Sequence, residues 1–264
     1  MTAYGQLRQV TAHAAVVLAA NPGPMTLDGT NTWLLRAAGA SDAIIVDPGP
    51  DDETHLAAVV AAAGRVAVIL LTHRHVDHSA GAARLHELTG APVRALDPAH
   101  RLASEGLAEG DVVAAAGVEL RVWATPGHSS DSVSFLLDPL DGSAAAVLTG
   151  DTILGRGTSV VAYPDGDLGD YLTSLRRLRE LGPVTVLPGH GPELAAAGEA
   201  AAAYLAHRSE RLAQVRAALD VLGPDAAPRA VVEHVYADVD QAVWPAAERT
   251  VQAQLAYLRG EGRH

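Results

Sequence analysis

The stretch VAVILLTHRHVDHSAG, residues 66–81, passes from pure hydrocarbon into three histidines and an aspartate within six positions. A short, continuous apolar run is typical of a buried strand, so the polar cluster lies where that strand ends. Neutral imidazoles and carboxylates are zinc ligands, and alternate residues of an extended segment point the same way. His73 and His75 can therefore bind one ion. Asp77 and His78 project differently and can serve a second ion beside the first.

Three further candidate ligands follow other apolar runs. His128 lies in TPGHS, Asp151 in LTGD and His190 in VTVLPGH, and each directly follows a glycine, which permits close backbone approach. Any one of them alone would pass for an ordinary turn residue. Strand ends in a layered α/β protein converge on one edge, where functional residues gather. Together with the first cluster they make seven groups, which is enough for two ions that share a carboxylate.

Composition excludes several kinds of chemistry. The chain has 264 residues, of which 48% are hydrophobic, so it can bury a sizeable core. It contains no cysteine, which excludes a disulfide framework and a thiolate ligand. All 19 basic residues are arginine, which excludes Schiff-base chemistry and a Walker-type lysine. A net charge of −12 argues against coating long nucleic acid through a broad basic face.

Strand-like and helix-like stretches alternate along the chain, which predicts an α/β class with helices covering sheets. The expected strands are 14–20, 32–37, 43–49, 66–73, 119–128, 143–151 and 184–190. The expected helices of this part are 51–64, 80–90 and 169–181.

The C-terminal part differs in character, because residues 194–221 are Ala-rich and two amphipathic stretches follow at 228–236 and 244–262. We therefore expect a catalytic domain over 1–206 and a small helical domain over 207–264. No apolar run reaches the roughly 18 residues of a membrane helix, and the N-terminus lacks the pattern of a secretory signal. The sequence thus predicts a cytoplasmic protein without a membrane partner.

The order HxHxDH followed by isolated His, Asp and His resembles the metallo-β-lactamase superfamily over residues 14–190. The resemblance implies a four-layer αββα sandwich with the metals at one edge. It implies that one metal is held by His73, His75 and His128, that the second is held by Asp77, His78 and His190, and that Asp151 bridges both. We expect two Zn²⁺ ions, although Mn²⁺ or Fe also suit such nitrogen and oxygen sites.

Longer stretches are similar to one branch of that superfamily, the β-lactamase-like-protein-2 group. They are NPGPMTLDGTNTWLL (21–35), GDTILGRGTSVV (150–161), LPGHGPE (187–193) and YLAHRSERLAQV (204–215). That group ends in a small winged-helix-like domain, and its mammalian members are endonucleases of single-stranded RNA. Here the sequence stops at RGEGRH, where a wing would begin, so we expect the C-terminal helices without the wing.

The expected mechanism is hydrolysis by a metal-bound hydroxide. Two divalent ions roughly 3.5–4 Å apart can share a water and lower its pKa from 15.7 towards about 7. Asp77 can orient that water and take its proton while it ligates, so it is the candidate catalytic residue. The site alone leaves ester, thioester, lactam and phosphodiester substrates open.

Five residues outside the ligand set are candidates for substrate binding. They are Asn31 and Thr32 in DGTNT, Arg156 and Thr158 in LGRGT, and His207 in AHRSE. Their hydroxyl, amide and cationic groups suit phosphate or carboxylate, but turn residues that bond their own backbone would look the same. Asp47 in IIVDPG fits a supporting or turn role better than that of a ligand.

The leading hypothesis is a dinuclear zinc hydrolase of the β-lactamase-like-protein-2 type, which the resemblance alone extends to cleavage of single-stranded RNA. Thioester hydrolysis of the glyoxalase II type and a broad specificity that includes β-lactams stay open. A hypothesis of another class is a nucleic-acid-binding regulator with a structural metal site. The C-terminal helices are alternatively a lid or a dimerisation element, the latter giving a homodimer.

Overall fold

Two sheets form the centre of the protein in the computed structural model, which describes residues 3–237, 240–241 and 244–260. In spatial order, the first sheet consists of β1 (Leu7–Gln9), β2 (Ala14–Leu18), β3 (Asn31–Leu35), β4 (Asp42–Val46), β5 (Arg65–Leu70) and β6 (Val93–Arg94). The second consists of β11 (Thr185–Pro188), β10 (Ala146–Gly150), β9 (Val133–Asp138), β8 (Val118–Ala124) and β7 (Val112–Ala115). Most neighbouring strands are antiparallel, but β4, β5 and β6 run parallel, as do β10 and β11.

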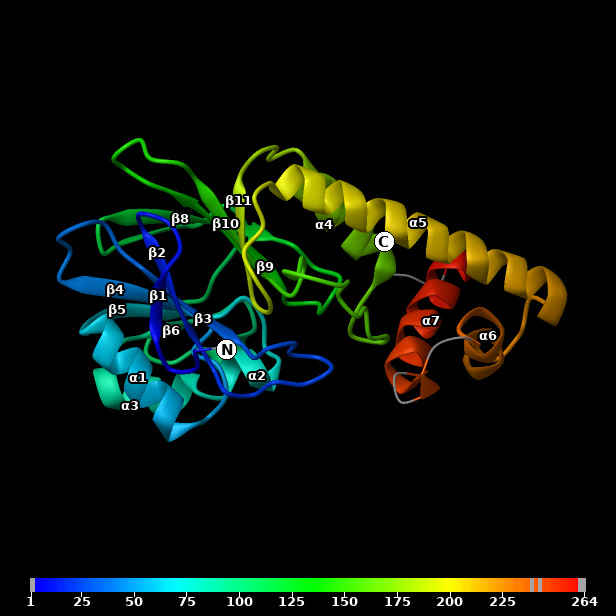
Figure 1. Ribbon diagram of the computed structural model, residues 1–264, viewed down its shortest axis with the longest axis horizontal. Helices are drawn as coiled ribbons and strands as arrows, with labels where there is room; N and C mark the ends of the chain where they lie inside the picture. Colours follow the sequence, from blue (N-terminus) through cyan, green and yellow to red (C-terminus); the bar gives the residue numbers. More distant parts are fainter. Residues whose placement is uncertain (1–2, 238–239, 242–243, 261–264) are drawn as a thin grey trace.

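Helices cover the outer face of each sheet (Figure 1). Those of the first half are α1 (Glu53–Ala63), the short α2 (Val76–Ser79), α3 (Ala82–Thr89) and a 3-10 turn at Pro98–His100. Those of the second half are α4 (Leu168–Arg179), α5 (Ala197–Leu222), α6 (Pro228–Val235) and α7 (Trp244–Arg259). Aspartates cap the N-termini of α1 and α4: the Asp52 side chain accepts a hydrogen bond from the His55 amide, and that of Asp167 accepts one from the Asp170 amide.

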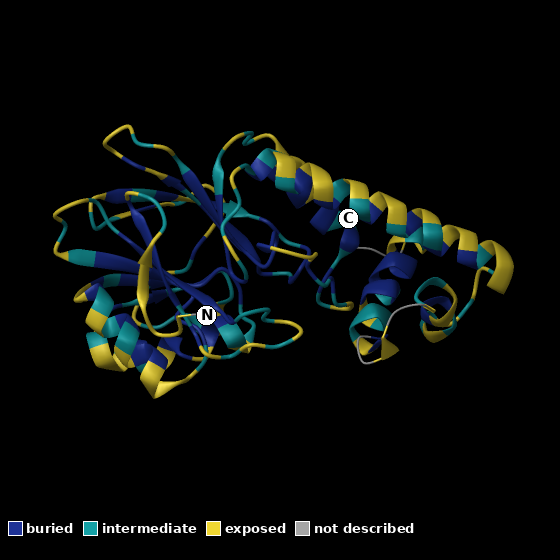
Figure 2. Ribbon diagram, viewed as in Figure 1, coloured by how far each residue is buried: buried dark blue, intermediate teal, exposed yellow. Residues whose placement is uncertain are grey.

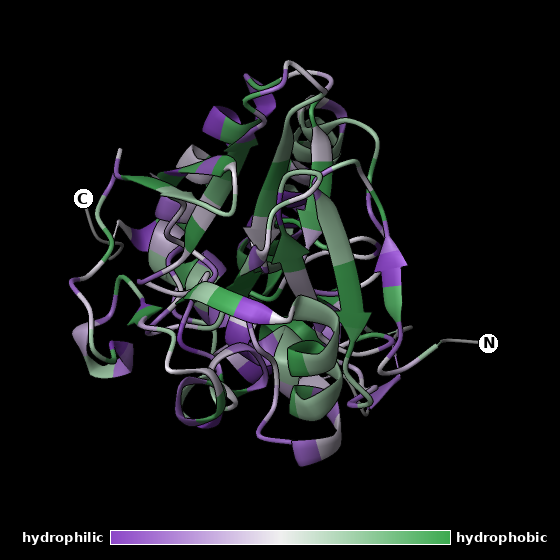
Figure 3. Ribbon diagram, turned by 90° about the vertical axis from the view of Figure 1, so that its left-hand side faces the viewer, coloured by the Kyte–Doolittle hydropathy of each residue, from purple (hydrophilic) through white to green (hydrophobic). Residues whose placement is uncertain are grey.

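Three apolar clusters separate the layers. The largest lies between the two sheets and includes Leu70 and Phe135, while the second packs α1 and α3 on the first sheet, and the third packs α4 and α5 on the second. Figure 3 shows that the interior strands are largely hydrophobic. The order of layers is thus helix, sheet, sheet, helix, which confirms the expected αββα sandwich.

The C-terminal helices form a unit with an apolar cluster of its own, in which Val215 of α5 meets Val231 of α6 and Leu255 of α7. Figure 1 shows α6 and α7 beside the far half of α5, away from the sheets. Among the described residues after 222 the structure contains helices and no strand. Residues 261–264, where we expected the wing to be missing, lie outside the described part.

The expected division at 206/207 falls inside α5, which is one continuous helix. Its first half packs on α4 through Tyr204, and its second half packs on α6 and α7. We therefore propose that both domains share this helix. No helix in the described part of the chain is long and apolar enough to cross a membrane.

Backbone bonds between the sheets fix the edge where the strand ends meet. The amide of Val133 in β9 donates to the carbonyl of Thr72 at 2.8 Å, and the amide of Asn31 in β3 donates to the carbonyl of Gly189 at 2.8 Å. These bonds bring the segment after β5 and the segment after β11 to one place, although the two belong to different sheets.

Candidate metal centre

Seven side chains from four segments converge at this edge, and they are the seven that the sequence singles out. The described residues contain three groups whose ligand atoms lie within 4.8 Å of one another: His73, His75 and His128; His73, His78 and Asp151; and Asp77, His78 and His190. His73 follows β5, His128 follows β8, Asp151 follows β10 and His190 follows β11. The tertiary structure therefore brings all the predicted ligands together.

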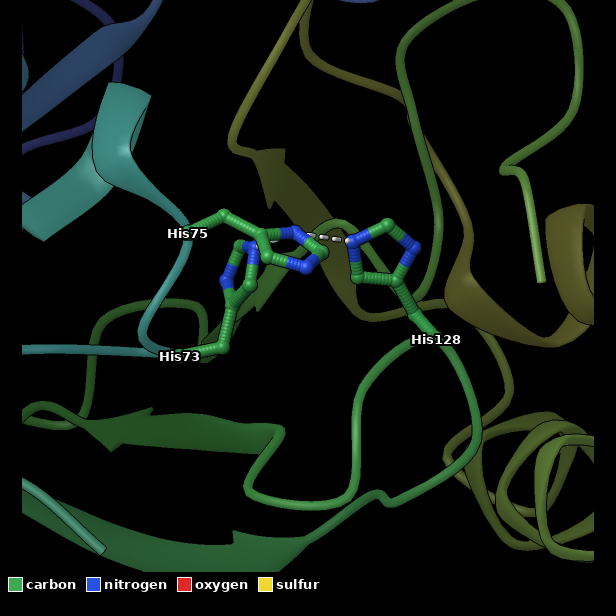
Figure 4. Close-up of side chains that lie close together, drawn as sticks. All are labelled: His73, His75 and His128. Carbon is green, nitrogen blue, oxygen red and sulfur yellow. Dashed lines mark hydrogen bonds between the residues drawn. The ribbon is translucent and has the colours of Figure 1, made fainter. Parts of the chain in front are cut away.

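The first group is a cluster of three imidazoles. His75 Nδ1 lies 3.0 Å from His73 Nε2 and 3.0 Å from His128 Nε2. Figure 4 shows the three rings directed toward one another, with His128 reaching in from a separate segment. Ligand atoms on a tetrahedral zinc with bonds of about 2.0–2.1 Å would stand about 3.3 Å apart, so these three nitrogens fit one ion.

The second group combines two imidazoles with a carboxylate. His78 Nε2 lies 3.1 Å from His190 Nε2, which in turn lies 3.1 Å from Asp77 Oδ2. His78 and His190 are completely buried, whereas the side chain of Asp77 is 25% exposed. Asp77 therefore stands at the open side of the site.

Asp151 lies between the two groups, and its two oxygens face different partners. Oδ1 lies 3.4 Å from His78 Nε2 and 3.5 Å from His190 Nε2, while Oδ2 lies 3.7 Å from His128 Nε2. Oδ1 is buried and has no hydrogen-bond partner among the described residues. A buried carboxylate oxygen without a donor is costly, and a cation would satisfy it.

Acceptors behind the site determine which ring nitrogen faces it. Nδ1 of His128 lies 2.7 Å from the carbonyl oxygen of Val160, and Nδ1 of His190 lies 3.0 Å from that of Gly29. A carbonyl oxygen only accepts, so both Nδ1 atoms carry the proton and both Nε2 atoms face the site. Orientation of a ligand ring by an outer acceptor is typical of metal sites.

Asp47 orients two further ligand rings, those of His78 and His73. Its carboxylate accepts from His78 Nδ1 at 2.8 Å, from the Thr72 hydroxyl at 2.6 Å and from the Thr72 amide at 2.8 Å. Because the Thr72 hydroxyl donates to Asp47, its oxygen can accept from His73 Nδ1, 3.0 Å away. Asp47 is thus a supporting residue and not a member of the ligand groups.

The charges of the site follow from burial and from its neighbours. Burial, with the rings of His78 and His128, holds the pKa of His73 well below its usual value, so this imidazole stays neutral. Burial alone would raise the pKa of Asp151, but the nearby His190 and His78 hold it well below its usual value. Despite burial, the carboxylates of Asp151 and Asp47 raise the pKa of His78 well above its usual value. His73 can therefore ligate as it stands, whereas His78 would have to give up its proton before it binds a cation beside the ionised Asp151.

Glycine is required where the backbone approaches the ligands most closely. A Cβ atom at Gly189 would lie 2.6 Å from His78 Cε1 and 2.7 Å from Asp151 Oδ1. Any side chain there would displace two candidate ligands, which explains the glycine of the PGH sequence at 188–190.

Arg74 stands between His73 and His75 in sequence, yet its guanidinium points away from the metal groups. It forms an ion pair with Asp165 at 2.5 Å and lies 3.6 Å from Asp131 and 3.7 Å from Asp97. The sequence analysis did not single out this cluster, because its three carboxylates come from loops that are distant in sequence.

The five candidate substrate residues are not brought to one place. The Asn31 amide donates to the carbonyls of Pro188 and Gly191, and the Thr32 hydroxyl lies 2.8 Å from His55 Nε2. Arg156 forms a surface ion pair with Asp28. Asn31 and Arg156 line one cleft, and Thr158 and His207 line another, next to Arg208. A role of these residues in substrate binding stays a prediction.

Comparison with known proteins agrees with the geometry. A family model described as Metallo-beta-lactamase superfamily matches residues 25–190, and one described as Beta-lactamase associated winged helix domain matches 227–263. A protein of Caenorhabditis elegans named Beta-lactamase-like protein 2 homolog is 34% identical over 93% of this chain and 84% of its own. The expected winged-helix-like character of the C-terminal part is thereby confirmed.

Two further proteins resemble different shares of this chain. An atrochrysone carboxyl ACP thioesterase of Aspergillus fumigatus is 38% identical over 66% of this chain and 55% of its own length. A β-lactamase domain protein of Burkholderia ambifaria has the same fold, with a TM-score of 0.80 and 24% identity over 99% of this chain and 90% of its own. The chain belongs to the metallo-beta-lactamase superfamily of metal-dependent hydrolases.

Proposed function

We propose that the chain is a dinuclear zinc hydrolase that cleaves phosphodiester bonds of single-stranded RNA. The observation that carries the dinuclear part is the position of Asp151, whose two oxygens face two separate ligand groups. RNA as the substrate is supported by the similarity to β-lactamase-like protein 2, which extends over nearly the whole chain, including the C-terminal helices. The proposal includes the number of ions, zinc as the metal and the seven ligands.

The residues of the site fit this chemistry. When bound, two divalent cations acidify a water and offset the charge that develops on the reacting group. Of the two carboxylates in the ligand groups, Asp77 is the more exposed, and its Oδ2 lies 3.1 Å from His190 Nε2, so we assign to it the proton of the water. His73, His78 and His190 are buried and keep their rings fixed, so that they position the reacting groups without rearrangement.

Thioester hydrolysis is the second candidate, because the thioesterase of Aspergillus fumigatus is 38% identical over the part of the chain that contains the ligands. The same site would accept a thioester carbonyl in place of a phosphoryl group. A broad specificity that includes β-lactams would also use it.

A panel of substrates separates these candidates. Purified protein is incubated with labelled single-stranded RNA, S-lactoylglutathione and a chromogenic cephalosporin, each with and without a chelator. We expect RNA to be cleaved with the highest kcat/KM and the chelator to abolish turnover. Asp151→Ala should lower kcat/KM by at least about 100-fold, since it removes the group between the ions. The exposed Asp225→Ala is the matched control. Turnover that survives both the chelator and Asp151→Ala would refute the metal mechanism.

A regulator with a structural metal site is a weaker alternative. A structural zinc normally has four protein ligands and no open position, whereas here seven donors lie together and the side chain of one of them, Asp77, is partly exposed. Specific binding of duplex DNA by the full chain, without hydrolysis of any substrate, would favour the regulator. The expected cytoplasmic location and homodimer stay predictions; a light-scattering mass tests the latter.

A further inference from the structure

A cleft lies between the loop after β10, whose Val160 carbonyl bonds His128, and the C-terminal helices. It has a volume of about 280 Å³, and its lining includes Thr158, Ser159 and Val160 from the loop. Arg208 and Arg211 of α5 and Thr250 of α7 line it as well. We call it the Arg208 cleft.

Arg208 is a buried cation without a carboxylate partner among the described residues. Its side chain comes from the middle of α5 and is only 3% exposed. It donates to the carbonyl of Ser159, and its guanidinium carbon lies 5.2 Å from the centre of the Tyr171 ring. Its Nε has no hydrogen-bond partner among the described residues. Burying a charge is costly unless it is paired, so this guanidinium lacks a counter-ion.

The surroundings increase the positive charge of the cleft. Arg211, one turn further along α5, bonds the neutral Gln214 and stacks over Tyr236 at 5.1 Å. None of the described residues that line the cleft carries a carboxylate, in a chain whose net charge is −12. Burial, with the charges of Arg208 and Arg211, lowers the pKa of the neighbouring His207.

A second buried side chain without partners lies on α7, although it does not line the cleft. Gln254 lies one turn after Thr250 on α7, so the two residues share a face of the helix. Its side chain is completely buried, and neither its amide nitrogen nor its amide oxygen has a hydrogen-bond partner among the described residues. Of the two side chains, only Arg208 lines the cleft, so it alone carries the inference.

We propose that the Arg208 cleft binds a phosphate group of single-stranded RNA while a neighbouring phosphodiester bond of the same strand lies at the metal centre. The fork of an arginine matches phosphate, and an anion would supply the counter-charge that Arg208 lacks. The cleft adjoins the metal centre, because Val160 lines the cleft and the carbonyl of the same residue accepts a hydrogen bond from His128. This inference rests on the proposed function, which supplies the strand.

Calorimetric titration of the full chain tests the cleft directly. Inorganic phosphate and a dinucleotide with one phosphodiester are titrated in excess chelator, so that binding to metal ions does not contribute. We expect Arg211→Gln and Arg208→Lys to weaken the binding of both by about tenfold or more, because each loses a charge-assisted bond or its fork geometry. Arg216→Gln is the matched control, since Arg216 lies on the exposed side of α5. Thermal melting followed by circular dichroism shows whether the Arg208→Lys variant folds. If it does not fold, the affinities of the Arg211→Gln variant alone decide whether the cleft binds phosphate.

The outcomes separate the cleft from the proposed function. Unchanged affinity for phosphate and dinucleotide in the folded variants would overturn the cleft, even if the chain cleaves RNA. Dependence of phosphate binding on Arg211 in a chain that cleaves no RNA would overturn the nucleic-acid assignment. Tight, Arg211-dependent binding of 4′-phosphopantetheine without binding of the dinucleotide would also overturn the nucleic-acid assignment. It would favour a thioester carrier as the occupant of the cleft. For RNA cleavage, Arg211→Gln should raise KM about tenfold and change kcat less.

Discussion

Asp47 has a left-handed backbone, with φ of 53°, which few residues other than glycine adopt. Its position immediately after β4 explains this conformation, because the turn directs its carboxylate to the segment after β5. There it accepts three hydrogen bonds, two from Thr72 and one from His78. One buried carboxylate thus sets the orientation of two candidate ligands, His73 and His78.

Replacing Asp47 by asparagine should weaken both the fold and the metal site. Asparagine keeps the shape, but its amide oxygen cannot accept all three bonds, and a buried donor left unpaired costs about 1–3 kcal/mol of unfolding free energy. Zinc affinity should fall about 10–100-fold, as for other residues that orient metal ligands. Urea unfolding and competition with a chromophoric chelator measure the two effects. The exposed Asp51→Asn is the control, and equal values for both variants would contradict the role of Asp47.

His55 makes the stability of the chain depend on pH outside the metal site. Burial in α1 lowers its pKa from 6.5, and its Nε2 lies 2.8 Å from the Thr32 hydroxyl. As the pH falls below 6.5, the unfolded chain takes up a proton at His55 before the folded chain does. The unfolding free energy therefore decreases between pH 6.5 and the folded pKa, by up to about 1.4 kcal/mol per pH unit.

His55→Gln should remove this contribution, so its unfolding free energy should decrease less steeply than that of the wild type below pH 6.5. Urea unfolding at pH values from 7.5 to 5 measures the slopes. His234→Gln, at an exposed position of α6, should keep the wild-type slope. A slope of His55→Gln equal to that of the wild type would show that the folded chain takes up the proton as readily as the unfolded one.

At the scale of secondary-structure elements, α5 connects the two parts of the molecule. It is 26 residues long, and its buried residues follow helical spacing from Ala201 to Ala218, as the alternation of colours along it shows (Figure 2). The first half closes the sandwich, the middle contributes Arg208, and the second half carries α6 and α7. A rigid helix therefore holds the C-terminal helices at a fixed place relative to the metal centre.

Ala206→Pro should break this connection. Ala206 is exposed, so the change acts through the backbone: it removes a helical hydrogen bond and costs about 3 kcal/mol or more. Unfolding followed by circular dichroism should show the loss, and cleavage of the preferred substrate should decrease as the C-terminal helices change position. Ala206→Gly, which costs about 1 kcal/mol, is the control for propensity alone. Wild-type stability of Ala206→Pro would mean that α5 is not continuous at this point.

At the scale of the whole molecule, the metal centre joins the two sheets. Ligands from β5 and α2 belong to the first sheet and its helices, and those after β8, β10 and β11 belong to the second. The apolar layer between the sheets holds the two halves together, and ions bound at the candidate site would add bonds across their edge. Metal binding should therefore stabilise the entire sandwich.

Removal of the metal tests this directly. Elemental analysis of the purified chain should give two divalent ions per molecule, and dialysis against a chelator should lower the melting temperature by several degrees, since ions bind only the folded site. Returning zinc should restore it. Asp225→Ala should behave like the wild type, and Asp151→Ala should bind fewer ions. A melting temperature unaffected by the chelator would contradict a site that spans both sheets.

The sequence by itself predicted the parts of the fold that depend on local pattern. Apolar runs became most of β4, β5, β10 and β11, the alternating stretch 118–124 became β8, and polar residues that follow these strands became the convergent set at the edge. This works because a buried strand needs an unbroken apolar stretch, while a ligand must stand where that stretch ends. The strands β1, β6, β7 and β9 were not expected; β9, although six residues long, was missed, and it pairs with β8 and β10 on either side.

Only the tertiary structure decided how the site is supported and where the other polar residues point. Val160, Gly29 and Asp47 select the ring nitrogens, although each lies at least 25 positions from the ring or threonine that it holds. The side chains of Asn31 and Thr32 bond backbone carbonyls and His55, whereas Arg208 lines a cleft between the loop after β10 and helices α5 and α7. Such choices depend on which acceptors and charges fold next to a side chain, and a linear pattern does not contain that information.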